Sequence, residues 1–170
     1  MIEKQLVCRG IDNPLILAAF QLLDRSNFIK TKWQRCAFSD IDLPLKEKEI
    51  FMIKSYSMAK MLTKILKIKH DNILIVEDAS GFTSAVFKYV FNESNCLSET
   101  INNLFTEKDT KFDVIFLDSF LYYEETIEKS KELLTKNGTI FYLKGSNEEN
   151  EFFFRLRREI TLEVVAEIVE

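Results

Sequence analysis

The stretch NILIVEDASGF, residues 72–82, joins an apolar run to side chains that could do chemistry. The run from Ile73 to Val76 is typical of a buried strand, and Glu77, Asp78 and Ser80 follow it closely. In an α/β protein, the turn after the first strand is where a ligand commonly binds. Two chemistries fit such a turn: a loop that cradles a cofactor, or an acidic site that holds a hard cation.

A phosphate or dinucleotide loop does not fit these residues. The stretch has one glycine, Gly81, and contains neither G-x-G-x-x-G nor G-x-x-x-x-G-K-[ST]. Phosphates bind helix N-termini through free N–H groups, and the carboxylates of Glu77 and Asp78 would repel a phosphate there.

An acidic signalling site stays open as an alternative. A receiver-like phospho-acceptor domain gathers an acidic pair, an acceptor aspartate and a lysine around Mg²⁺; here these would be Glu77, Asp78, Asp118 and Lys144. The order of elements argues against it, because one predicted helix separates Asp118 from Lys144 where a receiver has two strand–helix units. Residues 1–71 also precede the first strand.

The elements before this stretch are predicted to be helical. A short helix over residues 1–9 ends at Gly10, and a second begins with Asp12 as N-cap and Pro14 in its first turn. Residues 57–69 form an amphipathic helix with an apolar stripe of Met58, Met61, Leu62, Ile65 and Leu66. His70 follows it and is interpreted as a surface residue.

From residue 72 the pattern alternates between strands and helices. Strands are predicted over 72–76, 95–99, 112–118, 139–143, 151–157 and 161–169, with helices over 81–91 and 123–136. Asn137-Gly138 is interpreted as the C-cap of the second helix. The continuous apolar strands favour an α/β, Rossmann-like, mainly parallel sheet with helices on both faces. We expect one domain over 1–170, with a helical N-terminal extension (1–70) and a Rossmann-like core (71–170).

Composition excludes several classes of function. A net charge of −4 without a basic tail disfavours nucleic acid, and no apolar run is long enough for membrane insertion. The first residues do not resemble a secretory signal. Three widely spaced cysteines indicate reduced thiols in a cytoplasmic protein. With no Cys-x-x-Cys and a single histidine, a zinc site has almost no ligands, and no metal-binding residue is assigned.

The order of motifs resembles the protein-L-isoaspartate O-methyltransferase family, which has the class I S-adenosylmethionine-dependent fold. The opening MIEKQLVCRGIDNPLILAAFQLLDRSNFI is similar to the family's helix, Gly turn, Asp-x-x-hydrophobic helix and Arg-x-x-Phe segment. DIDLPL (40–45) resembles the stretch before the substrate loop in the alphaproteobacterial type. ILIVEDASGFTSAVF aligns on the cofactor loop, and FDVIFLDSF and LLTKNGTIFYL on the fourth and fifth strands.

The resemblance implies site residues and also shows where this chain departs from the family. The cofactor would lie against Glu77, Asp78, Ala79, Ser80, Gly81, Phe82 and Glu99, and the substrate loop would contain Met52, Ile53, Lys54 and Ser55. The family loop reads (Glu/Asp)-x-Gly-x-Gly-x-Gly-(Tyr/Phe), and here Ile75, Glu77 and Ala79 replace the acid and the first two glycines. KEKEIFMIKSYS (46–57) keeps no glycine, proline or threonine of the family's substrate loop.

The core is also shorter than the family fold requires. Residues 78–111 are too few for the expected helices and strands, which need roughly 45 residues. We expect the third strand and its helix to be missing. Glu99, at the end of the predicted second strand, is then positioned to hold ribose hydroxyls.

The function implied is methyl transfer from S-adenosylmethionine to isoaspartyl carboxylates of a protein or peptide. Because positioning of the two reactants supplies most of this catalysis, the altered loop predicts that transfer is lost or weak, as in a pseudoenzyme. No residue can be assigned as catalytic from the sequence. The alternative is a non-catalytic scaffold for a protein partner, bound through an apolar patch or the edge strand at 95–99.

Overall fold

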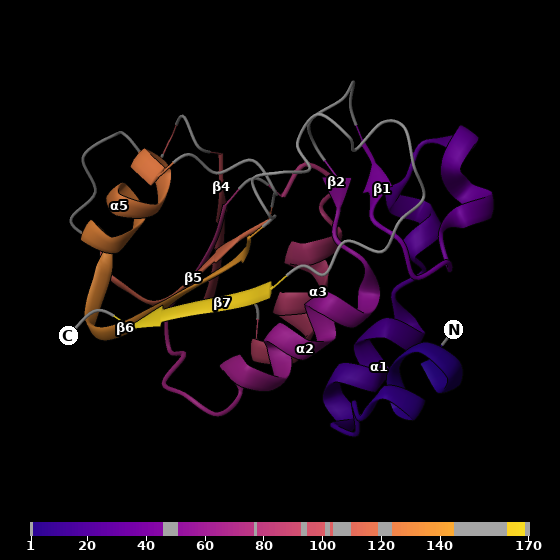
Figure 1. The fold of residues 1–170 in the computed structure, drawn as a ribbon, viewed down its shortest axis with the longest axis horizontal. Coiled ribbons are helices and arrows are strands. Elements are labelled where there is room, and N and C mark those ends of the chain that lie inside the picture. Colours follow the sequence, from indigo (N-terminus) through magenta and orange to yellow (C-terminus); the bar gives the residue numbers. More distant parts are fainter. Residues whose placement is uncertain are drawn as a thin grey trace.

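A five-stranded sheet with the order β4-β3-β5-β6-β7 organises the protein (Figure 1). The computed structural model describes residues 2–45, 51–76, 78–92, 95–100, 103, 110–118, 124–144 and 163–168. The strands are β3 (Ile73–Val76), β4 (Cys96–Glu99), β5 (Phe112–Leu117), β6 (Leu134–Lys144) and β7 (Glu163–Ile168). The first four are parallel to one another, and β7 pairs antiparallel with β6.

The strand residues alternate between two apolar cores, as the pleat of a sheet requires. Ile73, Ile75 and Phe116 belong to the core that also contains the N-terminal segments and α3. Leu74 and Val76 face the opposite side, where Ile127 of α5 packs. The sheet is therefore covered on both faces, and the predicted mainly parallel α/β fold is confirmed.

Helices from both halves of the chain cover the sheet (Figure 1). The helices α1 (Pro14–Leu22), α2 (Ser55–Ile65) and α3 (Phe82–Phe91) lie together, and α5 (Glu124–Glu132) lies apart from them. Four short helices precede or follow α1: η1 (Ile2–Leu6), η2 (Val7–Arg9), η3 (Arg25–Phe28) and η4 (Thr31–Cys36). The N-terminal part is not wholly helical, because β1 (Leu43–Pro44) pairs antiparallel with β2 (Phe51–Met52).

Several predicted helix ends are wrong. The helix predicted over 57–69 is α2, which spans Ser55–Ile65, and two predicted caps also differ. The N-cap of α1 is Asn13, one residue after Asp12, because the Asn13 side chain accepts hydrogen bonds from the backbone N–H groups of Leu15 and Ile16. In the second case the helix ends at Glu132, and Asn137-Gly138 lies inside β6.

The reason for this second error is the packing of β6. Phe112 pairs with Leu134 but Val114 pairs with Thr139, so β6 carries extra residues at a bulge. Asn137 has a left-handed φ of 66°, a conformation that occurs in some bulges as well as at helix ends. Burial of Leu134 against the α5 face holds this part of the chain in the sheet.

The remaining predicted elements near the sheet are confirmed. The strand at 95–99 is β4, and it is the outermost strand on its side in the part of the chain that the structure describes, as expected for a missing third strand. The tail segment 161–169 contains β7, whereas 151–157 lies outside the described residues. Within the described ranges, no helix has the length and apolarity needed to cross a membrane.

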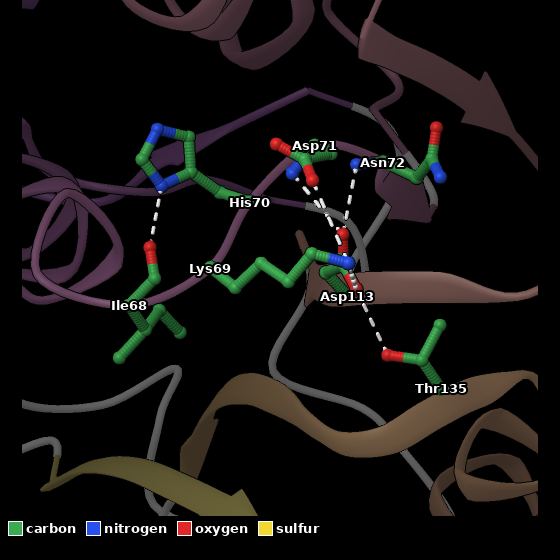
Figure 2. Close-up of polar contacts among 7 residues, drawn as sticks. All are labelled: Ile68, Lys69, His70, Asp71, Asn72, Asp113 and Thr135. Atoms are coloured by element: carbon green, nitrogen blue, oxygen red, sulfur yellow. Dashed lines mark hydrogen bonds and ion pairs between the residues drawn. The ribbon is translucent and has the colours of Figure 1, made fainter.

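A buried carboxylate joins the amino ends of β3 and β5 (Figure 2). Asp113 is 3% exposed and accepts hydrogen bonds from the backbone N–H groups of Asp71 (3.1 Å) and Asn72 (3.3 Å). The Thr135 hydroxyl donates to its other oxygen at 2.9 Å, and Lys69 Nζ lies 3.3 Å from that oxygen. Burial alone would raise the pKa of Asp113, but the bonds from Thr135, Lys69 and Asn72 outweigh it, so that the pKa is lowered.

The neighbouring His70 is half-buried and is not a fully exposed surface residue. Its Nδ1 lies 2.6 Å from the Ile68 carbonyl oxygen (Figure 2), and its ring centroid is 5.0 Å from that of Phe91. Both contacts hold the chain that enters β3, so the described geometry gives His70 a structural role.

We predict that Asp113→Asn lowers the free energy of unfolding at pH 7 by about 2 kcal/mol, because an amide cannot accept the full set of bonds. A lowered pKa stabilises the fold above the unfolded value, about 3.9, and this contribution is lost as the pH falls through the folded value. Urea denaturation at pH 7 and pH 3 measures both effects, with the exposed Asp12→Asn as control. Equal pH dependence in the wild type and Asp113→Asn would contradict the prediction.

Candidate functional site

The candidate site lies at the carboxyl ends of β3 and β5. The loop of residues 78–81 leaves β3, and Asp118 follows β5, where its backbone N–H donates to the Val76 carbonyl at 2.9 Å. The chain moves from β3 outward to β4 and then returns to the other side of β3 with β5. Ligands of open α/β sheets bind where the strand order reverses in this way.

The loop is held by its own side chains. Asp78 Oδ1 accepts a hydrogen bond from the Gly81 N–H at 2.7 Å, and Asp78 Oδ2 accepts from the Ser84 N–H at 2.7 Å. Ser80 Oγ accepts from the Phe82 N–H at 3.0 Å. Three N–H groups at the start of α3 are therefore already bonded within the protein. Gly81 has a left-handed φ of 79°, which favours the glycine retained there.

The other residues predicted for the loop differ in exposure. Ala79 is exposed, and Phe82 is fully buried. The Phe82 ring packs edge-on against Phe28 and Phe20, with centroids 5.3 Å and 6.1 Å away. Phe82 thus anchors α3 in the core. Glu77 lies outside the described residues.

Glu99 ends β4 at the same edge of the sheet. It pairs in register with Val76, and its carboxylate accepts a hydrogen bond from Asn103 Nδ2 at 2.9 Å. It is half-buried, and its backbone lies at the carboxyl edge from which the loop of residues 78–81 also leaves β3. The predicted role in holding ribose hydroxyls stays a prediction.

The predicted substrate segment is organised by a buried arginine. Arg25, from η3, is 0% exposed. Its Nη2 donates to the carbonyl oxygens of Ile53 (2.9 Å) and Met52 (3.4 Å), and its Nε contacts Met52 Sδ at 2.9 Å. Its Nη1 donates to the carbonyls of Ala37 and Ser39. The conformation of Met52 and Ile53 therefore depends on one guanidinium group.

Arg25 also lies near Phe82, which belongs to the segment that aligns on the family's cofactor loop. Its guanidinium carbon lies 6.0 Å from the centroid of the Phe82 ring. No carboxylate lies within ion-pair distance of Arg25 in the described part of the chain. Burial lowers the pKa of Arg25 to about 10, while the charges of Asp42, Asp40 and Asp118 oppose this change. It stays protonated at neutral pH.

The rest of the substrate segment is largely buried. Met52, Ile53 and Ser55 are at most 1% exposed, and Ser55 is the first residue of α2. The Lys54 N–H donates to Asp42 Oδ1 at 2.7 Å. Asp42 in turn has a raised pKa because it is buried, although the Lys54 bond opposes this.

Asp118 is a buried carboxyl with incomplete hydrogen bonding. It is 3% exposed, and its Oδ1 has no hydrogen-bond partner among the described residues. Burial raises its pKa well above the usual range, and the Asp78 charge raises it further; the Thr83 hydroxyl and Arg25 act in the opposite direction. The Thr83 side chain is itself fully buried. A buried carboxyl with a strongly perturbed pKa in this position is a candidate functional group.

Sequence reasoning gave Arg25 and Asp118 too little weight. The sequence indicates Arg25 only as part of the family's Arg-x-x-Phe segment. It indicates Asp118 only as the acceptor aspartate of a receiver-like domain. The signal for Asp118 is an acid directly after the strand Phe112–Leu117, in which five of the six residues are apolar. No local pattern distinguishes a buried arginine from an exposed one, because its five acceptors come from separate parts of the chain.

The structure does not support the alternative of a receiver-like phospho-acceptor domain. The sheet ends in an antiparallel strand, β7, beside β6, whereas receiver-type sheets are parallel throughout. In the described residues, no group of three or more His, Cys, Asp or Glu side chains could hold a metal ion. The Lys144 backbone pairs with Glu163 in β6 and β7.

The loop as folded does not fit the amino-acid part of S-adenosylmethionine. That part has a carboxylate, and the N–H groups of Gly81 and Ser84 are bonded to the Asp78 carboxylate. A ligand carboxylate at this position would meet the negative charge of Asp78 and lack these free donors.

We predict that Arg25→Lys lowers the free energy of unfolding by about 3 kcal/mol or more, because an ammonium cannot bond to acceptors on several sides. Arg35, which is exposed in η4, provides a matched control, and Arg35→Lys should change stability by less than about 0.5 kcal/mol. Chemical denaturation measures both variants. Equal losses in the two would show that Arg25 does not organise the segment.

Asp118 should have the opposite pH dependence from Asp113. A raised pKa means that the contribution to stability is complete below the unfolded value, about 3.9, and declines as the pH rises through the folded value. Asp118→Asn removes this titration. We expect it to match the wild type near pH 3 and to be about 1–2 kcal/mol more stable at pH 8. A variant less stable than the wild type at pH 8 would contradict this assignment.

Comparisons with known proteins agree with the fold. The family model described as "Protein-L-isoaspartate(D-aspartate) O-methyltransferase (PCMT)" matches residues 1–114. A protein-L-isoaspartate O-methyltransferase of Rhodopseudomonas palustris is 30% identical over 86 residues, which cover 51% of this chain and 39% of the relative. A protein-L-isoaspartate O-methyltransferase of Desulfosudis oleivorans is 26% identical over 113 residues, which cover 66% of this chain and 50% of the relative.

A solved protein-L-isoaspartate O-methyltransferase structure also superposes, with a TM-score of 0.63 and 19% identity over 85% of this chain and 55% of that chain. At this identity the match supports the fold alone. The chain spans about half the length of the curated relatives or less. Since the family model covers most of the chain, this protein belongs to the protein-L-isoaspartate(D-aspartate) O-methyltransferase family.

Proposed function

We propose that this chain is a methyltransferase-family domain in which S-adenosylmethionine binding is weakened, so that methyl transfer to isoaspartyl carboxylates is slow or lost. The observation that carries the proposal is the Asp78 carboxylate, which accepts hydrogen bonds from Gly81 and Ser84 at 2.7 Å each. The replacement of glycine by Ala79 and the short segment after β4 support it.

The partner in this proposal is a protein or peptide, as the family implies. A cytoplasmic location is supported by the three free cysteines, Cys8, Cys36 and Cys96. A non-catalytic scaffold is the second candidate. It is favoured by Leu97 on β4 and Tyr89 on the adjacent α3, which are each 42% exposed beside the outer strand of the described sheet.

Calorimetric titration with S-adenosylmethionine and with its demethylated product tests the main proposal. We expect no micromolar binding to the wild type, and a micromolar dissociation constant would overturn the proposal. A parallel assay with an isoaspartyl peptide measures methyl transfer. Binding without transfer would favour the scaffold candidate over weakened cofactor binding.

Asp78→Asn is the informative variant, since Asn caps a helix about as well as Asp but carries no charge. We predict that it binds S-adenosylmethionine about tenfold more tightly than the wild type, because a repulsion between two carboxylates is removed. Asp12→Asn removes an exposed carboxylate elsewhere and should not change the affinity. An unchanged affinity in Asp78→Asn would assign the weak binding to the loop's side-chain bulk instead of its charge.

A further inference from the structure

Asn137 and Gly138 form the one Asn-Gly pair of the sequence, and they lie in the bulge of β6. Leu134 of β6 pairs with Phe112 of β5, and the next pair in register places Thr139 opposite the residue two positions after Phe112. Strand β6 therefore advances by five residues where β5 advances by two. Pairing of β6 with β7 begins at Thr139. Asn137 and Gly138 thus lie in a part of β6 that is in register with neither neighbouring strand.

The Asn137 side chain is exposed, and its amide has no hydrogen-bond partner among the described residues. No such bond holds the amide away from the backbone nitrogen of the next residue. The φ of Asn137 is 66°, and Asn92, at the end of α3, is the other non-glycine residue with a left-handed φ (76°) in the described ranges. Asn92 is also exposed, but Glu93 follows it in the sequence. The two asparagines therefore share exposure and a left-handed backbone and differ in the residue that follows.

The packing of the bulge requires glycine at position 138. A Cβ there would lie 2.9 Å from the Thr135 carbonyl oxygen and 3.0 Å from Leu134 Cβ, so a larger residue would have to shift the backbone. Glycine also leaves its own backbone nitrogen open to close approach, because no side chain stands beside it. The fold therefore keeps an unhindered backbone nitrogen directly after an exposed side-chain amide.

We propose that Asn137 is a site of spontaneous deamidation in the folded protein and that the product is an isoaspartyl residue. The Gly138 nitrogen attacks Asn137 Cγ, and an N–Cγ bond forms. The Cγ–Nδ2 bond breaks, and the side-chain nitrogen leaves as ammonia after taking up the proton of the Gly138 N–H. Water from the solvent then opens the cyclic imide. Opening at the α-carbonyl breaks the original peptide C–N bond, so that the chain continues through Cγ as isoaspartate, whereas opening at Cγ gives aspartate.

Isoaspartate at this position adds a methylene group to the backbone and a negative charge to the bulge. The change falls two residues after Thr135, whose hydroxyl donates to the buried Asp113 carboxylate at 2.9 Å (Figure 2). The product also carries the chemical group named in the description of the family, an isoaspartyl residue in a protein. An active enzyme of the family therefore serves as a probe for it. The inference needs no activity of this chain, so it is independent of the proposed function.

Incubation of the full chain at pH 8 and 37 °C, followed by peptide mapping with mass spectrometry, tests the proposal. We expect isoaspartate to accumulate at Asn137, with no deamidated product at Asn92 in the same sample. An active protein-L-isoaspartate O-methyltransferase with labelled S-adenosylmethionine should label the incubated chain and not the fresh chain. Asn137→Gly, which suits a left-handed φ, should lose most of this label, whereas the matched Asn92→Gly should keep it.

The proposal is overturned if Asn137 stays intact in native buffer, if it yields aspartate alone, or if Asn92 is converted to the same extent. Full retention of the label in Asn137→Gly also overturns it. A parallel incubation in urea measures conversion of the unfolded chain. Conversion in urea but not in native buffer would mean that the folded bulge protects Asn137, which again overturns the proposal. None of these outcomes depends on the calorimetry with S-adenosylmethionine, so each idea fails separately.

Discussion

The hydrogen bonds of Arg25 are the constraint on which both halves of the candidate site depend. One guanidinium group bonds to the carbonyls of Ala37 and Ser39 after η4, of Met52 in β2, and of Ile53 after β2. It also lies over the ring of Phe82, which anchors α3. Moving the guanidinium group would leave four carbonyl oxygens without these hydrogen bonds. Other arrangements of these segments are therefore less stable. Because the surrounding acids lie beyond ion-pair distance in the described chain, Arg25 acts mainly through hydrogen bonds and only secondarily through charge.

Strand β5 carries two buried aspartates with opposite environments. Asp113, at the amino end, is bonded by two N–H groups, a hydroxyl and an ammonium. Asp118, at the carboxyl end, retains an oxygen without a partner. The same residue type is thus a structural group at one end and a candidate ligand-binding group at the other. This contrast agrees with the general division of α/β sheets, in which ligands bind at the carboxyl ends of the strands.

Much of the fold follows from the sequence, because strands buried on both faces leave continuous apolar runs and Gly81 marks a left-handed position. The prediction fails where distant contacts decide. Asn137-Gly138 has the composition of a helix end, yet pairing of Leu134 with Phe112 holds it in a strand. The run into Glu77 and Asp78 predicts a ligand site at the end of β3, and this stays a prediction. The bonds of Arg25 join segments distant in the chain, which no local spacing reveals.

In the loop after β3, side chains of the protein accept the hydrogen bonds that a ligand would otherwise accept. A glycine loop leaves the first N–H groups of the next helix for its ligand, and those groups are a cost to the empty protein. Here Asp78 and Ser80 supply the acceptors internally, so the start of α3 is complete without a ligand. The same carboxylate then lies beside Asp118 and disfavours its ionisation. The one carboxylate of Asp78 therefore completes the start of α3 and, through its charge, helps to keep the buried Asp118 carboxyl in its neutral form.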